Sequence, residues 1–235
     1  MQHDQPNVPP PYKAADAYSR IKAALHSYHS PAGEFLNIRN LASRLKISPT
    51  PVREALIKLA FEDVVGFTLR RGYFVKPLDV DDLGADYEMA MLMMRYSIES
   101  DGLAAIQSGP TNLAEWSKGI RRLDEEEAEV VAIYLEGLYD RIVWLSGNRR
   151  FINGIRHFTA RTRHIRRFGL TSALPYYAAV PTLHRLEEAI KSGQRAAALK
   201  LISQQYGKTI AALPDLVKDM NLKAQTNHIS FEELL

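Results

Sequence analysis

Two prolines fix where one helix of this chain begins. Pro49 and Pro51 follow Ser48 almost directly. The residues behind them are apolar at helical spacing: Val52, Ala55, Leu56, Leu59 and Ala60. A proline is tolerated in the first turn of a helix because the N–H that it lacks has no helical partner there. We therefore expect a rigid helix start, with Ser48 as the N-cap whose hydroxyl accepts a backbone N–H.

A shorter helix is expected just before this one. Residues 37–45 place Ile38, Leu41, Ala42 and Leu45 on one face, and residues 46–48 form a short turn. Two short helices joined by a turn of three to four residues are the helix-turn-helix unit. A further helix, with Ile21, Ala24 and Leu25 on one face, is expected ahead of it.

The periodicity changes at Val64. Residues 64–69 and 73–77 are short and rich in β-branched and aromatic residues, which predicts two strands. Arg70, Arg71 and Gly72 lie between them as a hairpin turn, and Gly72 permits the tight turn. Three helices followed by a hairpin are the order of a winged helix-turn-helix, in which a basic hairpin tip suits the minor groove of DNA.

Beyond this module the pattern is helical, with breaks at Gly and Pro. The predicted helices span 81–107, 111–129, 131–146, 149–168, 175–192, 194–212 and 214–222. The expected fold is therefore mainly α: an N-terminal winged helix-turn-helix and a C-terminal all-α bundle. The predicted parts are a flexible segment 1–14, a DNA-binding domain 15–78, a helical domain 79–222 for effector binding and dimerisation, and a C-terminal tail 223–235.

The charge is unevenly placed along the chain. Residues 1–78 carry eleven Lys/Arg against six Asp/Glu, while residues 79–235 carry nineteen against twenty-one. A basic module joined to a slightly acidic one favours a nucleic-acid contact at the N-terminal end. The chain has no cysteine, no apolar run long enough for a membrane span and no signal-peptide core, so we expect no membrane association and a cytoplasmic location.

The candidate DNA-binding residues of the helix-turn-helix lie near its two helix starts. Arg53 is one turn into the second helix, where a guanidinium reaches guanine O6 and N7 or a phosphate. Ser48 and Thr50 offer hydroxyls beside it, and Arg39 on the preceding helix is placed to reach the backbone. The alternative is that these residues form an ordinary solvated face. Their joint spacing, followed by Arg70, Arg71 and Gly72, favours the DNA interface.

The segment "LNIRNLASRLKISPTPVREALIKLAFEDVVGFTLRRGYFV" resembles the DNA-binding domain of the GntR family of bacterial transcription regulators. The "S-x-T-P-V-R-E-A-L" core and the "R-G-Y-F-V" wing carry the resemblance. It implies that Arg39, Arg53 and Gly72 mark the DNA-contacting surface. Two positions depart from the family pattern: Pro49 stands where an arginine is usual, so the operator contact is expected to differ, and Asp63 replaces a usual glycine.

The helical region resembles the FCD subfamily of these regulators, through "LYDRIVWLSGNRRFINGI" and "LHRLEEAIKSGQRAAALKLISQQY". Many FCD proteins hold a divalent metal with an Asp and three His. The matching positions here are Leu135, Tyr139, His184 and Tyr206, so three of the four ligands are absent and we expect no metal or other cofactor. Leucine cannot coordinate a metal, and neutral tyrosine is a poor ligand for these ions. A one-residue shift would instead bring Glu136 and Asp140 into play.

The arginine-rich helix predicted at 149–168 allows two interpretations. Its arginines form a basic exposed face, with Arg156, Arg163 and Arg167 pointing away from the apolar stripe. Alternatively, Arg161 or Arg166 reaches into the bundle and binds a carboxylate effector bidentately. The expected effector-binding residues are therefore Tyr139, Arg161, Arg166, His184 and Tyr206. The acidic run at 124–129 is expected to be a solvated helix face.

Together these features predict a transcription regulator, not an enzyme. As a homodimer it would bind double-stranded, palindromic operator DNA at the nucleoid, because one recognition helix covers only a half-site. An organic or sugar acid in the helical domain would change its DNA affinity, and the resemblance implies a repressor. Two alternatives stay open: a constitutive DNA-binding regulator with a vestigial effector pocket, and an enzyme with an accessory DNA-binding domain.

Overall fold

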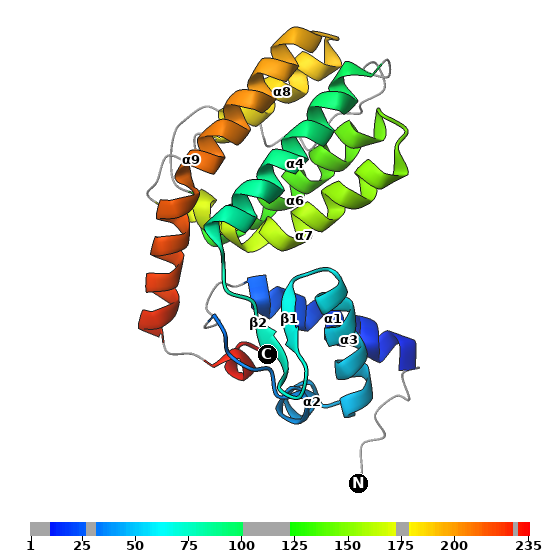
Figure 1. The fold of residues 1–235 in the computed structure, drawn as a ribbon, viewed down its shortest axis with the longest axis vertical. Helices are drawn as coiled ribbons and strands as arrows, with labels where there is room; N and C mark the ends of the chain where they lie inside the picture. The colour runs from blue at the N-terminus through cyan, green and yellow to red at the C-terminus, as the bar shows by residue number, and fades with distance from the viewer. Residues whose placement is uncertain (1–9, 27–31, 101–122, 173–178, 228–229) are drawn as a thin grey trace. The chain divides into compact units, whose positions relative to one another are not determined.

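The computed structural model of the chain describes residues 10–26, 32–100, 123–172, 179–227 and 230–235 (Figure 1). The chain forms two compact units. The first comprises Met1–Pro77 together with Asn221–Leu235, and the second comprises Leu78–Met220. Within the described residues the structure is helical apart from one two-stranded sheet, which confirms the predicted fold class of a winged helix-turn-helix followed by a helical domain.

The first unit begins with three helices: α1 (Pro10–His26), α2 (Ile38–Leu45) and α3 (Pro49–Phe61). Residues 10–14, predicted to belong to a flexible segment, are helical. The reason is that Pro10 opens the helix, where a missing N–H costs no hydrogen bond. Residues 1–9 lie outside the described part of the chain. Between α2 and α3, Lys46 adopts φ 55°, and its N–H bonds the last carbonyls of α2 to form the turn.

A hairpin follows the helices. Strands β1 (Val65–Thr68) and β2 (Gly72–Val75) pair antiparallel, with Val65 opposite Val75 and Thr68 opposite Gly72. The backbone of residues 33–36 pairs with the other edge of β2, which the sequence analysis did not anticipate. The hairpin is therefore anchored to the chain that enters α2.

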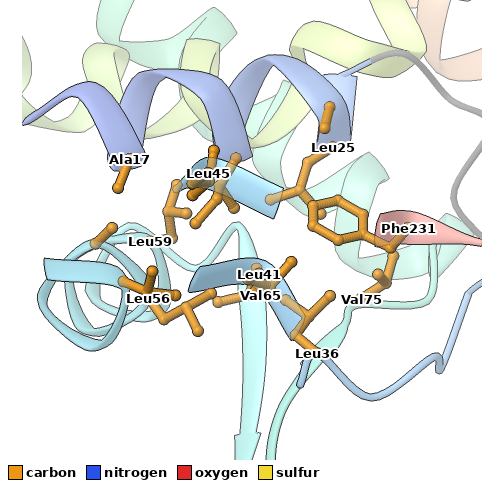
Figure 2. Packing of buried hydrophobic residues seen from close by; sticks show 14 of the residues in the cluster. Ala17, Leu25, Leu36, Leu41, Leu45, Leu56, Leu59, Val65, Val75 and Phe231 are labelled. Carbon is orange, nitrogen blue, oxygen red and sulfur yellow. The ribbon is translucent and has the colours of Figure 1, made fainter. Parts of the chain in front are cut away.

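One apolar cluster fills the interior of this unit (Figure 2). It joins the predicted inner faces of the three helices to the hairpin: Ala17, Ile21, Leu41, Leu45, Val52, Leu56, Leu59, Val65 and Val75. Phe231, from the segment beyond α9, belongs to the same cluster and is fully buried. Burying each large apolar side chain is worth roughly 1.5–3 kcal/mol, so this cluster holds the helices in their order.

The second unit is a helical bundle. Its described helices are α4 (Val80–Glu99), α6 (Glu125–Trp144), α7 (Arg149–Thr171), α8 (Ala179–Lys191) and α9 (Arg195–Asn227), the last of which runs on into the first unit's residues. Figure 1 shows α4, α6 and α7 packed together. None of the helices in the described residues is both long and apolar enough to cross a membrane.

One predicted helix boundary in the bundle is wrong. A break was expected between residues 129 and 131, but α6 is continuous from Glu125. Asp124 caps it, and Glu127 completes a capping box by bonding back to the Asp124 N–H. The acidic run therefore starts a helix and does not end one. The rest of the predicted helix 111–129, up to residue 122, lies outside the described residues.

The predicted break at Pro214 is also wrong. Helix α9 continues through this proline to Asn227, so the separate helix expected at 214–222 does not exist. A proline inside a helix removes one backbone hydrogen bond and costs about 3 kcal/mol. Buried leucines on both sides, Leu213 and Leu216, offset that cost by holding the two halves in the core.

A polar cluster at the C-terminal end of α3 connects this helix to α1. Glu62, the C-cap of α3, accepts hydrogen bonds from the Tyr18 hydroxyl (2.7 and 2.9 Å) and from Lys22 Nζ (2.8 Å). Burial alone would raise the pKa of Glu62, but the bonds from Lys22 and Tyr18 outweigh it and lower the pKa. Ionised Glu62 therefore stabilises the folded unit.

We predict that Glu62→Gln lowers the free energy of unfolding of this unit by about 1–2 kcal/mol at pH 7. Because the folded pKa is depressed, this stabilisation is present above the unfolded value of about 4.3 and is lost as pH falls through the folded pKa. Hydrogen-exchange protection of the α3 core amides measures the difference. The difference between Glu62→Gln and the wild type should vanish near pH 3. Glu54→Gln, at an exposed residue of the same helix, should change nothing at either pH. An equal loss for Glu62→Gln at both pH values would contradict the assignment.

Candidate nucleic-acid interface

The start of α3 shows one departure from expectation. Ser48 occupies the N-cap position with extended backbone angles (φ −72°, ψ 159°), as predicted, but its side chain makes no capping hydrogen bond. A capping hydroxyl accepts from the N–H of the second or third helical residue. Pro51 is the third and has no N–H, so the two prolines that stiffen the helix also remove one of the partners. The exposed Ser48 hydroxyl therefore remains at the outer surface beside Pro49.

The outer face of α3 carries the predicted contact residues. Thr50 and Arg53 are exposed, while Val52 and Leu56 on the opposite face are buried in the core. The two sets lie on opposite sides of the same turns because the helical repeat separates them. The core therefore aims Thr50 and Arg53 away from the protein.

Helix α2 presents a second cation in its first turn. Asn37 caps the helix, accepting from the N–H groups of Arg39 (2.9 Å) and Asn40 (3.2 Å). Arg39 is exposed at this end, where the helix dipole favours an anion. The capping role of Asn37 was missed in the sequence, although an Asn directly before an apolar-periodic run is a recognised signal.

The tip of the wing is Leu69, Arg70 and Arg71. Arg70 has φ 71° and Gly72 has φ 95°, so the turn uses two left-handed residues and Gly72 fulfils its predicted role. A Cβ at Gly72 would meet no neighbour, which means that backbone conformation, not space, requires the glycine.

The two wing arginines differ in their surroundings. The Arg71 guanidinium lies 4.3 Å from the centre of the Phe35 ring, a cation–π contact that holds it against the body of the unit. Arg70 is exposed at the tip next to Leu69, which is 77% exposed. Phe35 was not among the predicted site residues, because its contact with Arg71 depends on the pairing of residues 33–36 with β2.

The bundle interior contains several of the predicted effector residues. Tyr139 and Tyr206 are buried and face each other with ring centres 6.0 Å apart, and Tyr87 and Phe158 complete the aromatic cluster. Burial raises the pKa of Tyr206 well above its ordinary value, and the phenol of Tyr139 adds to the effect. Tyr206 is therefore neutral at ordinary pH, the form that binds metals poorly. His184 is half-buried on α8.

The two candidate effector arginines are paired with carboxylates of the bundle. Arg161 lies 3.1 Å from Asp86 on α4. Arg166 is 1% exposed and donates to Glu136 at 2.6 Å and to the Thr159 carbonyl at 3.1 Å. Its guanidinium also lies 5.8 Å from the centre of the Phe158 ring, so it borders the aromatic cluster. A carboxylate ligand would add to or exchange with these pairs.

Arg163 and Arg167 of α7 do not belong to a basic exposed face, which was one of the two predictions, because both pair with carboxylates of α6. Arg163 pairs with Glu129 and Glu136, and Arg167 pairs with Glu129 at 2.9 Å. Arg156 is largely exposed and pairs with Asp140, and Arg149 and Arg150 at the start of α7 are exposed as well. The acidic run at 124–129 is largely exposed, as predicted for a solvated helix face, although Glu129 pairs with Arg163 and Arg167 of α7. The sequence pattern of one helix does not show which charged residues will pair with a neighbouring helix, so Arg163 and Arg167 were expected to be solvated.

The positions that matched the metal ligands of the FCD subfamily hold no ligand set in the described residues. Leu135 is a buried apolar residue, and the shifted alternative, Glu136 and Asp140, is engaged by arginines. No cluster of three or more His, Cys, Asp or Glu suited to a metal occurs in that part of the chain.

The fold and the cationic outer face of α2, α3 and the wing define a winged helix-turn-helix DNA-binding protein. Residues 13–75 match the family described as "Bacterial regulatory proteins, gntR family". The chain is 30% identical over 144 residues to the Nta operon transcriptional regulator of Aminobacter aminovorans, a match spanning 60% of this chain and 67% of that protein. The chain belongs to the GntR family and is a DNA-binding transcriptional regulator, not an enzyme.

Other similarities agree with this assignment. The chain is 31% identical over 117 residues to the uncharacterized HTH-type transcriptional regulator BphR of Paraburkholderia xenovorans, covering 50% of this chain and 41% of that one. A GntR transcriptional regulator from Rhodococcus sp. RHA1 superimposes with a TM-score of 0.65 at 18% identity, covering 87% and 98% of the two chains. E. coli McbR/YncC gives 0.60 at 19% identity, covering 86% and 97%. The last two similarities, at less than 20% sequence identity, show a common fold and nothing more.

We predict that Arg53→Ala weakens specific DNA binding and leaves the fold intact, because Arg53 is exposed and contributes nothing to the core. The loss of one bidentate base contact is worth about 1–3 kcal/mol, or roughly 5- to 150-fold in affinity. Fluorescence anisotropy on a duplex selected with the wild-type protein measures it, and circular dichroism checks the fold. Glu54→Ala, an exposed neighbour, is the matched control and should not weaken binding.

Pro49→Arg is a companion test of the helix start, and it should tighten binding or shift sequence preference. Unchanged affinity on all sequences would place position 49 away from the DNA. Wild-type affinity in Arg53→Ala would overturn the assigned interface.

Proposed function

We propose that this chain is an FCD-type regulator that binds a palindromic operator as a homodimer and releases it when a small acid binds the helical domain. The observation that carries the DNA-binding part is the joint exposure of Arg39, Thr50 and Arg53 beside the Arg70 wing tip. In this proposal residues 15–78 bind DNA, and residues 79–222 bind the effector and dimerise. A regulator of this kind acts at the nucleoid, in the cytoplasm.

In the proposed interface, Arg53 and Thr50 read bases in the major groove, and Arg39 and Ser48 contact phosphates. Arg70 enters the minor groove, with Gly72 permitting the turn. Arg71 supports the wing through Phe35 and adds charge near the backbone. This division gives sequence readout to α3 and positioning to the other elements.

Dimerisation is supported by two apolar stripes on neighbouring helices. Helix α4 exposes Met89, Leu92 and Tyr96, and α6 exposes Val130 and Ile133. The helices pack together, and their C-terminal ends adjoin where the Ser100 hydroxyl donates to the Leu145 carbonyl (3.0 Å). Exposed apolar stripes on two packed helices are the kind of surface that proteins use for interaction. A second copy of the chain is the occupant that a palindromic operator requires.

The effector site is proposed in the bundle interior around Arg161, Arg166, Tyr139, Tyr206 and His184. The support is the combination of two guanidinium groups with the phenols of a buried aromatic cluster, of which Tyr206 has a raised pKa. An organic or sugar acid offers the carboxylate that arginine binds bidentately and hydroxyls that phenols can bond.

The Aminobacter relative is named as the regulator of an operon. By analogy, the present chain would repress an operon and release it when the acid binds, through a coupling free energy between the two sites. A constitutive regulator is the second candidate. It is favoured by one observation: both arginines already have carboxylate partners within the protein, Asp86 and Glu136.

We predict that Leu92→Glu produces a monomer. Leu92 is 65% exposed at the centre of the α4 stripe, and burying an unpaired carboxylate in an interface is costly. Dimerisation measured by analytical ultracentrifugation should weaken at least ~100-fold, about 2.7 kcal/mol. Leu222→Glu, also at an exposed leucine (52%), is the control and should stay dimeric. An unchanged dimer in Leu92→Glu would refute this interface.

A thermal-shift screen against organic acids, sugar acids and metal salts separates the two regulator candidates. We expect one acid to raise the unfolding midpoint of the helical domain by about 5 °C at a concentration 100 times its Kd. Arg161→Ala should abolish the shift, and Arg156→Ala, at an exposed pair of the same helix, should preserve it. A panel in which no compound alters stability or operator affinity would establish the constitutive regulator.

A further inference from the structure

The segment Ser230–Leu235, here called the strap, is docked on the DNA-binding unit. Phe231 is fully buried, and Leu234 and Leu235 pack against the same cluster. Figure 2 shows the Phe231 ring beside Leu25 and Val75. The short helix η3 (Phe231–Leu234) contacts both α1 and α2. The strap therefore supplies part of the core of the unit that binds DNA.

Polar contacts fix the strap around its buried phenylalanine. The Phe231 N–H donates to the Glu34 carboxylate (3.3 Å), and the Arg20 guanidinium donates to the Leu235 carbonyl (2.9 Å). Burial raises the pKa of Glu34, and the Phe231 N–H opposes the increase by stabilising the ionised form. The bonding groups on the unit, Glu34 and Arg20, belong to different elements, so together they form a site with a defined geometry.

The strap is shaped for this site by bonds of its own. The Ser230 N–H donates to the Glu233 carboxylate (2.9 Å), and the Glu233 N–H donates to the Ser230 carbonyl (3.0 Å). This reciprocal pair of bonds holds a short turn in its docked form and reduces the entropy lost on docking. Glu232 approaches the Asn40 side chain on α2 at 3.5 Å.

We propose that the strap is an intramolecular ligand of the DNA-binding unit, and that its docking sets operator affinity by holding α2 in place. The DNA part of this inference rests on the proposed function. Helix α9 belongs to the bundle up to Met220 and leads along the chain to the strap. The DNA-binding unit is therefore tied to the bundle at two chain crossings, after Pro77 and after Met220. After the second of these connections the chain leads to the strap, which contacts α2, the helix that carries Arg39.

The consequence of undocking follows from the core. Without Phe231, the side chains that surround it lose a partner, and the cavity weakens the contacts that η3 makes with α1 and α2. Helix α2 determines where Arg39 stands and, through the turn at Lys46, where α3 begins. The acidic rim of the strap works in the opposite direction, because Glu232 and Glu233 repel phosphate. The packing effect dominates, since Glu233 is exposed and Glu232 is half-buried, while Phe231 is fully buried.

The first experiment compares Phe231→Ala with Leu222→Ala in the full chain. Phe231→Ala should lower the unfolding midpoint of the DNA-binding unit by about 10 °C. Hydrogen exchange of the α1 and α2 amides measures the loss of stability. Operator affinity should fall about tenfold. Leu222→Ala, at an exposed leucine of α9, should change neither. Wild-type exchange and affinity in Phe231→Ala would overturn the proposal.

The second experiment does not depend on the stability of a cavity variant. The chain has no cysteine, so Asn40→Cys combined with Glu232→Cys gives two unique thiols at the docked contact. A short bis-maleimide should link them within one chain and preserve operator affinity. Linkage only between two chains, or none, would overturn intramolecular docking. Exchange and crosslinking need no DNA, so a docked strap in a protein that binds no operator would refute the proposed function and leave the docking intact.

Discussion

The structure of the DNA-binding unit depends on the burial of one face of α3. Val52, Leu56 and Leu59 pack into a core shared with Ala17 and Ile21 of α1. Because a helix cannot bury one face without presenting the other, this packing determines that Thr50 and Arg53 face outward. The ion pair of Glu62 with Lys22 then fixes the rotation and position of the helix end. The chemistry of the interface is thus a consequence of apolar packing, to which the arginines contribute nothing.

Features of the DNA-binding unit that arise from local sequence were predictable. The helix start at Pro49, the turn near Lys46 and the hairpin tip at Gly72 each depend on residues a few positions apart. The same local reasoning failed for the Ser48 hydrogen bond, although the cause was present in the sequence: Pro51 offers no N–H at the third helical position. The cation–π contact of Arg71 with Phe35 could not be predicted from the sequence, because it depends on residues 33–36 pairing with a strand about forty positions later.

In the bundle, the errors came from assessing helices one at a time. Arg163 and Arg167 of α7 look solvated in the sequence, and in the structure they pair with Glu129 and Glu136 of α6. Pro214 breaks a helix by local rules, but burial of Leu213 and Leu216 on either side keeps α9 continuous. Burial of Phe231 in a unit that begins more than two hundred residues earlier is the extreme case, since no periodicity points to it. Contacts distant in sequence decide these features.

The proposed function requires the winged helix-turn-helix to bind a two-fold symmetric site as a dimer. Selection of tight-binding duplexes from a random pool with the full-length protein tests it directly. A dimeric protein should enrich an inverted repeat whose half-site centres lie about one helical turn, roughly 10 base pairs, or a multiple of it apart. Enrichment of a single unrepeated half-site, or of no sequence at all, would contradict it.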